Sequence, residues 1–424
     1  MGRTATRGTL ALSIPIAAML WAGTACGGDV QPGELITKAN ADKIRHLVSP
    51  GVEWCVKHGM TMKIVPYRAV EWNKAYRDAT GKYAGQTKLA ADGRSLVGHV
   101  AGMPFPTIDP NDPQIALKIM WNFEYKPFVT DDQDLRNFDA DTGPVGATGA
   151  LQAERHFLLD HLRTLWYTAR LYVDPKPELP NPDGVRAKAS LHPILEPFDL
   201  KGVGETSIRY LNPDRQDDTW LYMPSLRRVR RLSSAQRSDA LFGQDTDTDS
   251  FGGYAGQIPW FTWKYLGEKE VLASFHAEAF PVKYCEGADF VFCDTWEKRK
   301  VYVIEGVPKV PQYAYGKRLL FIDKETYLVP FSDISDRAGQ LWKVWISQFA
   351  FKKRATATSG DEYPDEMPFN PSVTMVDLQL SHATRSALPS SRYPGEQGWY
   401  FNQGGKTGLE EEFFSVAHLI EASH

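Results

Sequence analysis

Residues 217–251 read "DDTWLYMPSLRRVRRLSSAQRSDALFGQDTDTDSF" and contain the pattern that decides the fold. An apolar, strand-like run leads into "RRVRR", residues 227–231, and an acidic "DTDTD", residues 245–249, follows. Since alternate residues of a strand face opposite ways, Arg228 and Arg230 share one face of the basic segment. So dense a group of arginines can hold nucleic acid, anionic lipid or carboxylates of the same protein.

The composition of the whole chain decides among these partners. The 424 residues are 42% hydrophobic and 24% charged, as in ordinary globular proteins, and the formal net charge is −4. Nucleic-acid binders usually carry a basic balance, so no nucleic acid is expected as a partner. Because arginine forks fit carboxylates, we expect structural ion pairs between the basic strand and the acidic loop, with an outward pair of arginines facing lipid head groups or a partner. The residues of these predicted pairs are Arg227, Arg228, Arg230, Arg231, Asp245, Asp247 and Asp249.

The N-terminus has the pattern of an export signal. Arg3 and Arg7 precede an apolar run at residues 10–23, which is too short for a comfortable membrane span. Small residues before Cys26 suit ordinary signal peptidase, and "GTAC" also partly matches a lipoprotein box, whose cysteine is acylated. We predict a signal peptide over residues 1–25 and a periplasmic protein, either free or lipid-anchored to the outer membrane through Cys26.

The remaining cysteines suggest a disulfide, which an exported compartment permits. Cys285 and Cys293 bracket "EGADFVF", so a short hairpin closed by their bridge is predicted. Cys55 is the alternative partner of either, because spacing does not settle connectivity. No zinc-finger spacing is present.

Local patterns divide the chain into a helical first part and a strand-rich second part. Helices are predicted at 34–48, at 67–80 and from Pro113 onward. The acid-rich residues 131–141 and the polar residues 354–372 are predicted to be loops. From about residue 195, short strands alternate with turns, including a hairpin whose turn is "PDRQDD". We therefore predict a mainly β protein with some α-helix, with 26–66 as an N-terminal extension that carries a helix and 67–424 as one domain.

The predicted strands have apolar residues on both faces. One interpretation is a sheet covered by helices on one face and loops on the other, and another is a curved sheet whose concave face lines an apolar cavity. For the second, the candidate ligand-binding wall residues are Trp220, Tyr222, Trp260, Phe261, Trp263, Trp342 and Trp345.

Motifs of catalysis and of cofactor binding are missing. The chain has no G-x-S-x-G nucleophile elbow and no phosphate loop, and "GVGETS", residues 202–207, lacks the third glycine of a dinucleotide fingerprint. "DTDTD" opens like a calcium loop, but Ser250 and Gly256 stand where that loop needs glycine and glutamate. We expect no cofactor, no metal and no enzyme.

The quoted segment resembles the periplasmic outer-membrane lipoprotein-sorting proteins, with a W-L-Y-x-P strand, a basic R-R-V-R-R-L strand and an acidic loop with F-G-x-D. Residues 96–127 and 245–269 also match typical stretches of an uncharacterised branch of that group, a domain family of unknown function. The resemblance runs from about residue 65 to the end. It implies a LolA-like unclosed antiparallel β-barrel with helices across its opening and an apolar interior that holds acyl chains. Members of the branch often accompany resistance-nodulation-division type transporters.

Three functions follow as hypotheses. The first is a non-enzymatic periplasmic carrier for a lipid, a lipoprotein acyl chain or another hydrophobic small molecule, with an envelope transporter and the outer membrane as partners. The second is a docking or scaffold protein of a transporter complex without its own cargo. The third is an envelope hydrolase or calcium-dependent protein, supported only by the acid-rich segments 131–141 and 245–249.

Overall fold

The computed structural model describes residues 29–355, 362–392, 398–407 and 409–422. The predicted signal peptide and Cys26 lie outside the described residues. Within them, no helix is long and apolar enough to cross a membrane.

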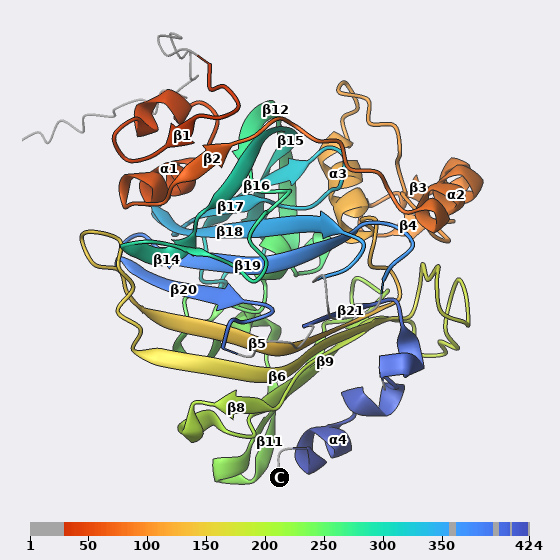
Figure 1. Ribbon diagram of the computed structural model, residues 1–424. Helices are drawn as coiled ribbons and strands as arrows, with labels where there is room; N and C mark the ends of the chain where they lie inside the picture. The colour runs from red at the N-terminus through yellow and green to blue at the C-terminus, as the bar shows by residue number, and fades with distance from the viewer. Residues whose placement is uncertain (1–28, 356–361, 393–397, 408, 423–424) are drawn as a thin grey trace, which may run out of the picture.

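One large sheet forms the body of the protein, and neighbouring strands pair antiparallel along its length (Figure 1). From one edge to the other it runs β11 (Arg228–Leu232), β10 (Asp218–Met223), β9 (Gly204–Tyr210), β7 (Val185–Leu191), β6 (Arg155–Trp166), β5 (Asp132–Pro144), β20 (His382–Ala387), β19 (Met367–Asp377), β18 (Leu341–Lys352), β17 (Phe331–Ser335), β16 (Lys317–Asp323), β15 (Asp294–Pro308) and β12 (Phe261–Ala273).

Shorter strands extend this sheet at its margins. β8 (Ile194–Glu196) pairs with β6, β21 (Trp399–Phe401) pairs with β5, and β1 (Leu35–Ile36) pairs with β2 (Met62–Ile64). β2 pairs with β15 in the parallel direction, so the sheet is mixed. Because the described strands do not pair β11 with β12, the sheet is an unclosed barrel, as predicted.

The two faces of the sheet carry different cores, because alternate residues of each strand point to opposite faces. The face that looks into the cavity described below is called the inner face, and the opposite one the outer face. On β18, Val344 and Ile346 pack on the outer face, whereas Trp345 packs on the inner face. The expectation of apolar residues on both faces is confirmed.

The outer face is covered by the N-terminal segment and by a small hairpin. Val52 and Val56 of α1 (Pro50–Lys57) pack in one cluster with Val344 and Ile346, and all four side chains are fully buried. The hairpin of β13 (Tyr284–Cys285) and β14 (Ala288–Phe292) adds to the same cluster, and a Cys285–Cys293 disulfide closes it. The disulfide prediction is confirmed, and Cys55 is free and buried.

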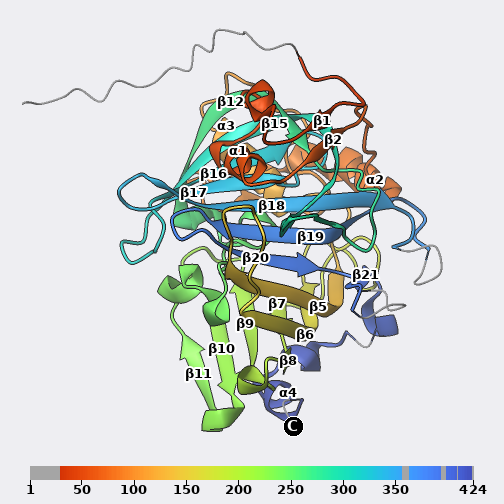
Figure 2. The ribbon, with the colours of Figure 1, turned by 60° about the vertical axis from the view of Figure 1, so that its left-hand side comes forward.

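Other helices cover the inner face and the lower end of the sheet. α3 (Ile115–Glu124) packs on the inner face, where its Ile119 and Met120 join the cluster of Trp345. α2 (Lys74–Tyr83) and the hairpin of β3 (Lys88–Leu89) and β4 (Leu96–Val97) lie beside α3, and α4 (Val416–Glu421) lies near β9 and β10 (Figures 1 and 2).

Several local predictions need correction. Residues 34–48 contain β1 and a 3-10 turn instead of one helix, because the apolar face there is too irregular for a continuous helical stripe. Residues 132–141 belong to strand β5 and not to a loop, and the acids of β5 are themselves buried, where hydrogen bonds and ion pairs hold them. β19 begins at Met367, inside the predicted loop 354–372. The segment predicted as an N-terminal extension contributes two strands and a helix to the outer-face core.

Candidate functional site: an apolar cavity inside the half-barrel

The inner face of the sheet encloses a cavity of about 480 Å³. Its walls come from β5, β6, β7 and β9 on one side and from β18, β19 and β20 on the other, with the C-terminal end of α3 and the loop around residues 241–255 above them. Bulky apolar side chains on the wall include Phe138, Leu159, Leu162, Phe242, Trp345 and Phe349. The volume falls within the roughly 300–1,000 Å³ of small-molecule pockets in proteins.

Small side chains on β5, β7 and β9 leave this space open. Ala140, Ala187, Ala189 and Ser207 all line the cavity, and Ala189 pairs directly with Ser207 across the two strands. Interiors are normally close-packed, so a patch of small residues opposite bulky ones leaves a void. The void here is large enough for a ligand.

A left-handed residue in β5 changes which of its side chains face the cavity. Asn137 has a left-handed backbone (φ 56°), which asparagine tolerates better than most residues. Before it, Gln133 and Leu135 line the cavity, and after it Phe138 and Ala140 do. The inward side chains therefore change from odd to even numbers at Asn137, which hides the strand from a simple test of alternation.

The inner face of β9 is polar and forms one end of the cavity. Glu205, Ser207 and Arg209 line the cavity in alternation along the strand. Nε and Nη2 of Arg209 donate to Oδ2 of Asp217 at 3.1 and 2.7 Å. Nη1 of Arg237 lies 3.4 Å from the same oxygen. The cavity thus joins a mainly apolar wall to one charged end.

The charges at this end are strongly coupled. Burial by itself raises the pKa of Asp217, but the charges of Arg209 and Arg237 outweigh it and hold that pKa below its ordinary value. Arg237 also forms an ion pair with Asp249, and its guanidinium lies 5.5 Å from the ring centre of Trp260. The two guanidiniums are thus held by carboxylates of the protein.

The predicted wall residues are mostly elsewhere. Trp345 lines the cavity. Phe261 and Trp263 pack with Tyr254 in a solid aromatic cluster behind the wall, at ring-centre distances of 5.0 and 5.1 Å from it. The remaining predicted wall residues lie away from the lining, namely Trp220, Tyr222, Trp260 and Trp342.

The wall was missed because the prediction looked for aromatic residues. None of the residues with which β7 lines the cavity is aromatic, and Ala187 and Ala189 are among them. The lining of β5 belongs to a segment whose acids on the outer face suggested a loop. Small residues alternating with charged ones in "VRAKAS", residues 185–190, are the signal that could have found it.

The predicted pairs between the basic strand and the acidic loop do not form, and their members that are paired have other partners. The arginines at 227, 228, 230 and 231 are exposed, and Arg231 pairs with Asp218 of the neighbouring strand β10. Arg227 precedes β11 in a left-handed turn (φ 49°), so it is not on the strand. The acidic loop does not fold back on β11, and the pairing prediction is wrong in its partners.

The acids of "DTDTD" are buried anchors held by other strands. Asp245 accepts from His382 at 2.8 Å and Asp247 accepts from the Tyr315 hydroxyl at 2.6 Å. Asp249 pairs with Arg237 of the segment before the loop. Every acid of this loop has a protein partner, so the structural role was predicted correctly and the partners were not.

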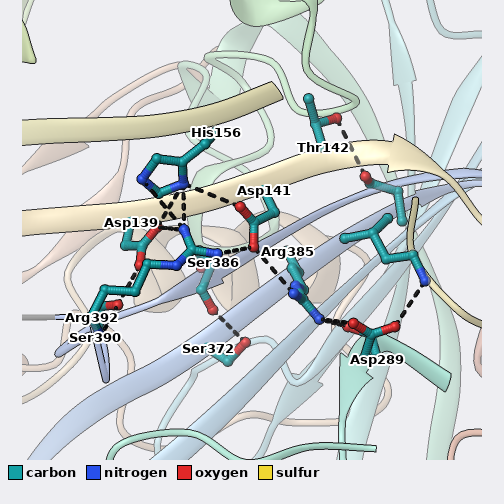
Figure 3. Close-up of polar contacts among 12 residues, drawn as sticks. Asp139, Asp141, Thr142, His156, Asp289, Ser372, Arg385, Ser386, Ser390 and Arg392 are labelled. Carbon is teal, nitrogen blue, oxygen red and sulfur yellow. Dashed lines mark hydrogen bonds and ion pairs between the residues drawn. The ribbon is translucent and has the colours of Figure 1, made fainter. Parts of the chain in front are cut away.

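A second cluster of charged residues lies on the outer face of β5 and β6 (Figure 3). Asp139, Asp141 and His156 offer ligand atoms within 4.8 Å of one another. Figure 3 shows Arg392 reaching between them, with Nη1 2.8 Å from Asp139 and Nη2 2.6 Å from Asp141. Arg385 adds a contact of 3.1 Å to Asp141. Guanidinium groups thus stand where a cation would bind, and the cluster is an ion-pair network.

The pKa shifts agree with an ion-pair network. The hydrogen bond with Asp141 raises the pKa of His156, against the effect of burial. Burial raises the pKa of Asp139, although Ser390 and Arg392 oppose this rise. The network ties β5, β6 and β20 together on the side of the sheet away from the cavity.

An unclosed, mixed but mostly antiparallel sheet around an apolar cavity defines the class of this protein. The model of the family described as "Protein of unknown function (DUF1329)" matches residues 35–419, and the chain belongs to that family. The predicted family is therefore confirmed. An uncharacterised Pseudomonas aeruginosa protein, PA3922, is 24% identical over 366 residues, which are 82% of this chain and 74% of the relative.

Two solved structures are similar at low identity. A domain described as an outer membrane lipoprotein-sorting protein domain, from Vibrio parahaemolyticus, has a TM-score of 0.49 and 19% identity, and the match covers 73% of this chain and all (100%) of that one. A LolA superfamily protein from Nitrosomonas europaea has a TM-score of 0.40 and 14% identity, with 72% of this chain and 98% of that one covered.

Proposed function

We propose that this protein is a non-enzymatic periplasmic carrier that binds a lipid, a lipoprotein acyl chain or another hydrophobic molecule in its cavity. The observation that carries the proposal is the cavity of about 480 Å³ with its mainly apolar wall. Each methylene group that leaves water for such a wall contributes roughly 0.8 kcal/mol. An acyl chain therefore needs few specific contacts to be held.

The acid-rich segments do not favour the hydrolase alternative. The acids of 131–141 belong to a strand of the main sheet, and Asp139 and Asp141 are engaged by Arg392. The carboxylates of residues 245–249 are engaged by donors of the protein itself. Both segments have structural explanations.

The edge hairpin β10–β11 supports a docking surface for the carrier. Arg228 and Arg230 are exposed on β11, which pairs with β10 on one side and forms the sheet edge on the other. Leu226 at the tip of the hairpin is 46% exposed. Exposed cations beside an exposed apolar residue suit anionic lipid head groups. The proposed partner of this edge is therefore an anionic membrane surface, reached together with an envelope transporter.

Cargo is tested by native mass spectrometry and lipid extraction on protein purified from the envelope. A defined co-purified hydrophobic molecule is expected. A clean ligand-free mass, together with no uptake of an environment-sensitive apolar fluorophore, would favour the docking or scaffold function instead.

The site of binding is tested with a matched pair of tryptophan variants. Ala189→Trp fills the cavity from its floor and should abolish fluorophore uptake. Ala338→Trp places the same side chain in the exposed β17–β18 turn and should leave uptake unchanged. Equal uptake by both variants would place the binding outside this cavity.

Docking is tested by sedimentation with vesicles of anionic or zwitterionic lipid. The wild type should sediment with anionic vesicles only, and Arg228→Glu with Arg230→Glu should abolish this. Sedimentation of that double variant at the wild-type level would exclude β11 as the contact.

A further inference from the structure

The charged end of the cavity contains one carboxyl group more than it has arginines to pair with. Arg209 and Arg237 line the cavity and provide two guanidiniums. Asp217 and Glu205 line it with two carboxyl groups, and Asp249, which is not part of the lining, adds a third through its ion pair with Arg237. The two aspartates take up the arginines, as described above. Glu205 is the carboxyl group that is left over.

Glu205 has no hydrogen bond or ion pair with any residue in the described part of the chain, although it is only 8% exposed. Its neighbours across the ladder are Leu191 of β7 and Leu221 of β10, both apolar. Buried carboxyl groups are nearly always hydrogen-bonded, so an unpaired one needs an explanation. Since Glu205 lines the cavity, its missing partner fits a group on the ligand.

The electrostatics of this end agree with an unsatisfied acceptor. Burial raises the pKa of Glu205 to about 7, and the charge of Arg237 opposes only part of that rise. A donor on a ligand would stabilise the ionised carboxylate and offset the cost of burying it.

We propose that Glu205 receives the polar head of the ligand, a hydrogen-bond donor such as an ammonium or hydroxyl group, while the apolar body of the ligand fills the rest of the cavity. This inference rests on the proposed carrier function and narrows its cargo. A carboxylate or phosphate head is disfavoured for two reasons. It would meet Glu205, and the two guanidiniums at this end of the cavity, those of Arg209 and Arg237, are already held by Asp217 and Asp249.

Ligands that differ only in their head group test the proposal. Dodecylamine, dodecanol and dodecanoate are compared for their power to displace a bound apolar fluorophore at about pH 8. The wild type should bind the amine tightest and the carboxylate weakest. Glu205→Gln should weaken the binding of dodecylamine by at least about ten-fold, which is the usual effect of losing a hydrogen bond to a charged group. Dodecanoate should bind Glu205→Gln as well as or better than it binds the wild type.

Two controls distinguish a specific effect of Glu205 from a general effect of removing a charge and from misfolding. Glu71→Gln changes a carboxyl group that is 88% exposed and should change no affinity. Glu205→Gln removes no hydrogen bond or ion pair within the part of the chain that the structure describes, so its fold should survive, and circular dichroism checks this. A second variant, Glu205→Ala, should weaken the amine in the same way.

The results separate this inference from the carrier function. If Glu205→Gln loses affinity for the amine alone, the head group of the ligand is an ammonium. If it loses a comparable affinity for the alcohol, the head group is a hydroxyl. Unchanged affinities for all three ligands in Glu205→Gln would overturn the inference and leave the carrier function intact. A wild type that takes up neither fluorophore nor ligand would overturn the carrier function itself.

Discussion

The outer and inner faces of the same sheet differ in how tightly their apolar residues are packed. On the outer face, the N-terminal segment and the β13–β14 hairpin fill the space, and Phe331 and Ile346 are fully buried there. On the inner face, bulky residues on one side meet Ala187 and Ala189 on the other, and a cavity remains. The outer face is built for stability and the inner face leaves room for a ligand.

One buried carboxyl group on each face makes the same contrast. Asp333 on the outer face accepts from the Ser49 hydroxyl at 2.7 Å and from the Gly51 backbone N–H at 3.2 Å. Glu205 on the inner face has no such partner in the described part of the chain. Burial raises the pKa of both, to about 6 for Asp333, where the two hydrogen bonds oppose it, and to about 7 for Glu205. Hence the outer face satisfies its polar group internally, and the inner face does not.

The largest expected effect compares a phenylalanine on each face. Phe331→Ala removes a fully buried ring from the outer core, and the free energy of unfolding should fall by about 3–5 kcal/mol. Phe138→Ala removes a half-buried ring that already borders a cavity, and the loss should be about 1 kcal/mol. Urea denaturation measures both. Equal losses would mean that the inner face is packed as tightly as the outer one.

The next effect is the pH dependence of stability caused by Glu205. Burial on folding raises the pKa of its carboxyl group from the ordinary 4.5 to about 7, so between these pH values the folded state binds the extra proton. Stability should therefore fall by about 3 kcal/mol as the pH rises from about 4.5 to about 7, and stay level above that.

Glu205→Gln isolates this contribution. The variant should lose less stability than the wild type over that pH range, whereas Asp333 contributes equally to both proteins and cancels. Thermal denaturation at a series of pH values measures the difference. Parallel pH profiles of the two proteins would show that Glu205 is not buried as described.

A smaller effect is expected for the disulfide on the outer face. Cys285→Ser with Cys293→Ser opens a short loop whose ends are 8 residues apart in the sequence. The free energy of unfolding should fall by about 2 kcal/mol, because the unfolded chain gains conformational freedom. Denaturation with and without reductant measures it. The reductant should destabilise the wild type and have no effect on the double variant, and fluorophore uptake should persist in both because the hairpin is on the other face.

The smallest effect is expected at the rim of the sheet. Arg228→Glu with Arg230→Glu changes exposed side chains, so the free energy of unfolding should change by less than about 0.5 kcal/mol. Urea denaturation measures this change. A loss of several kcal/mol would restore the expectation that these arginines hold the fold together.

Local interactions explain what could be predicted. The β9–β10 hairpin and the Cys285–Cys293 bridge both join residues that are close in sequence. Turn residues and alternating apolar residues signal such elements directly. The helix after Pro113 was found for the same reason, because proline suits the start of a helix.

Long-range interactions explain what could not be predicted. Asp245 forms a hydrogen bond with His382, which is 137 residues away in the sequence, and not with the arginines that are nearby in the chain. β5 was hidden because its acids meet Arg385 and Arg392, far along the sequence, and because the inward face changes at Asn137.

The sequence by itself determined the strand-rich character and the disulfide, because each depends on local pattern or on neighbours in the chain. It also determined the family, and the resemblance to that family implied the half-barrel. Only the tertiary structure decided which residues line the cavity, which partners hold the acidic loop and that Glu205 has no hydrogen bond or ion pair among the described residues. The physical reason is the same in each case. The curl of the sheet brings β5 to β9 opposite β18 to β20, and side chains from distant segments meet, or fail to meet, only there.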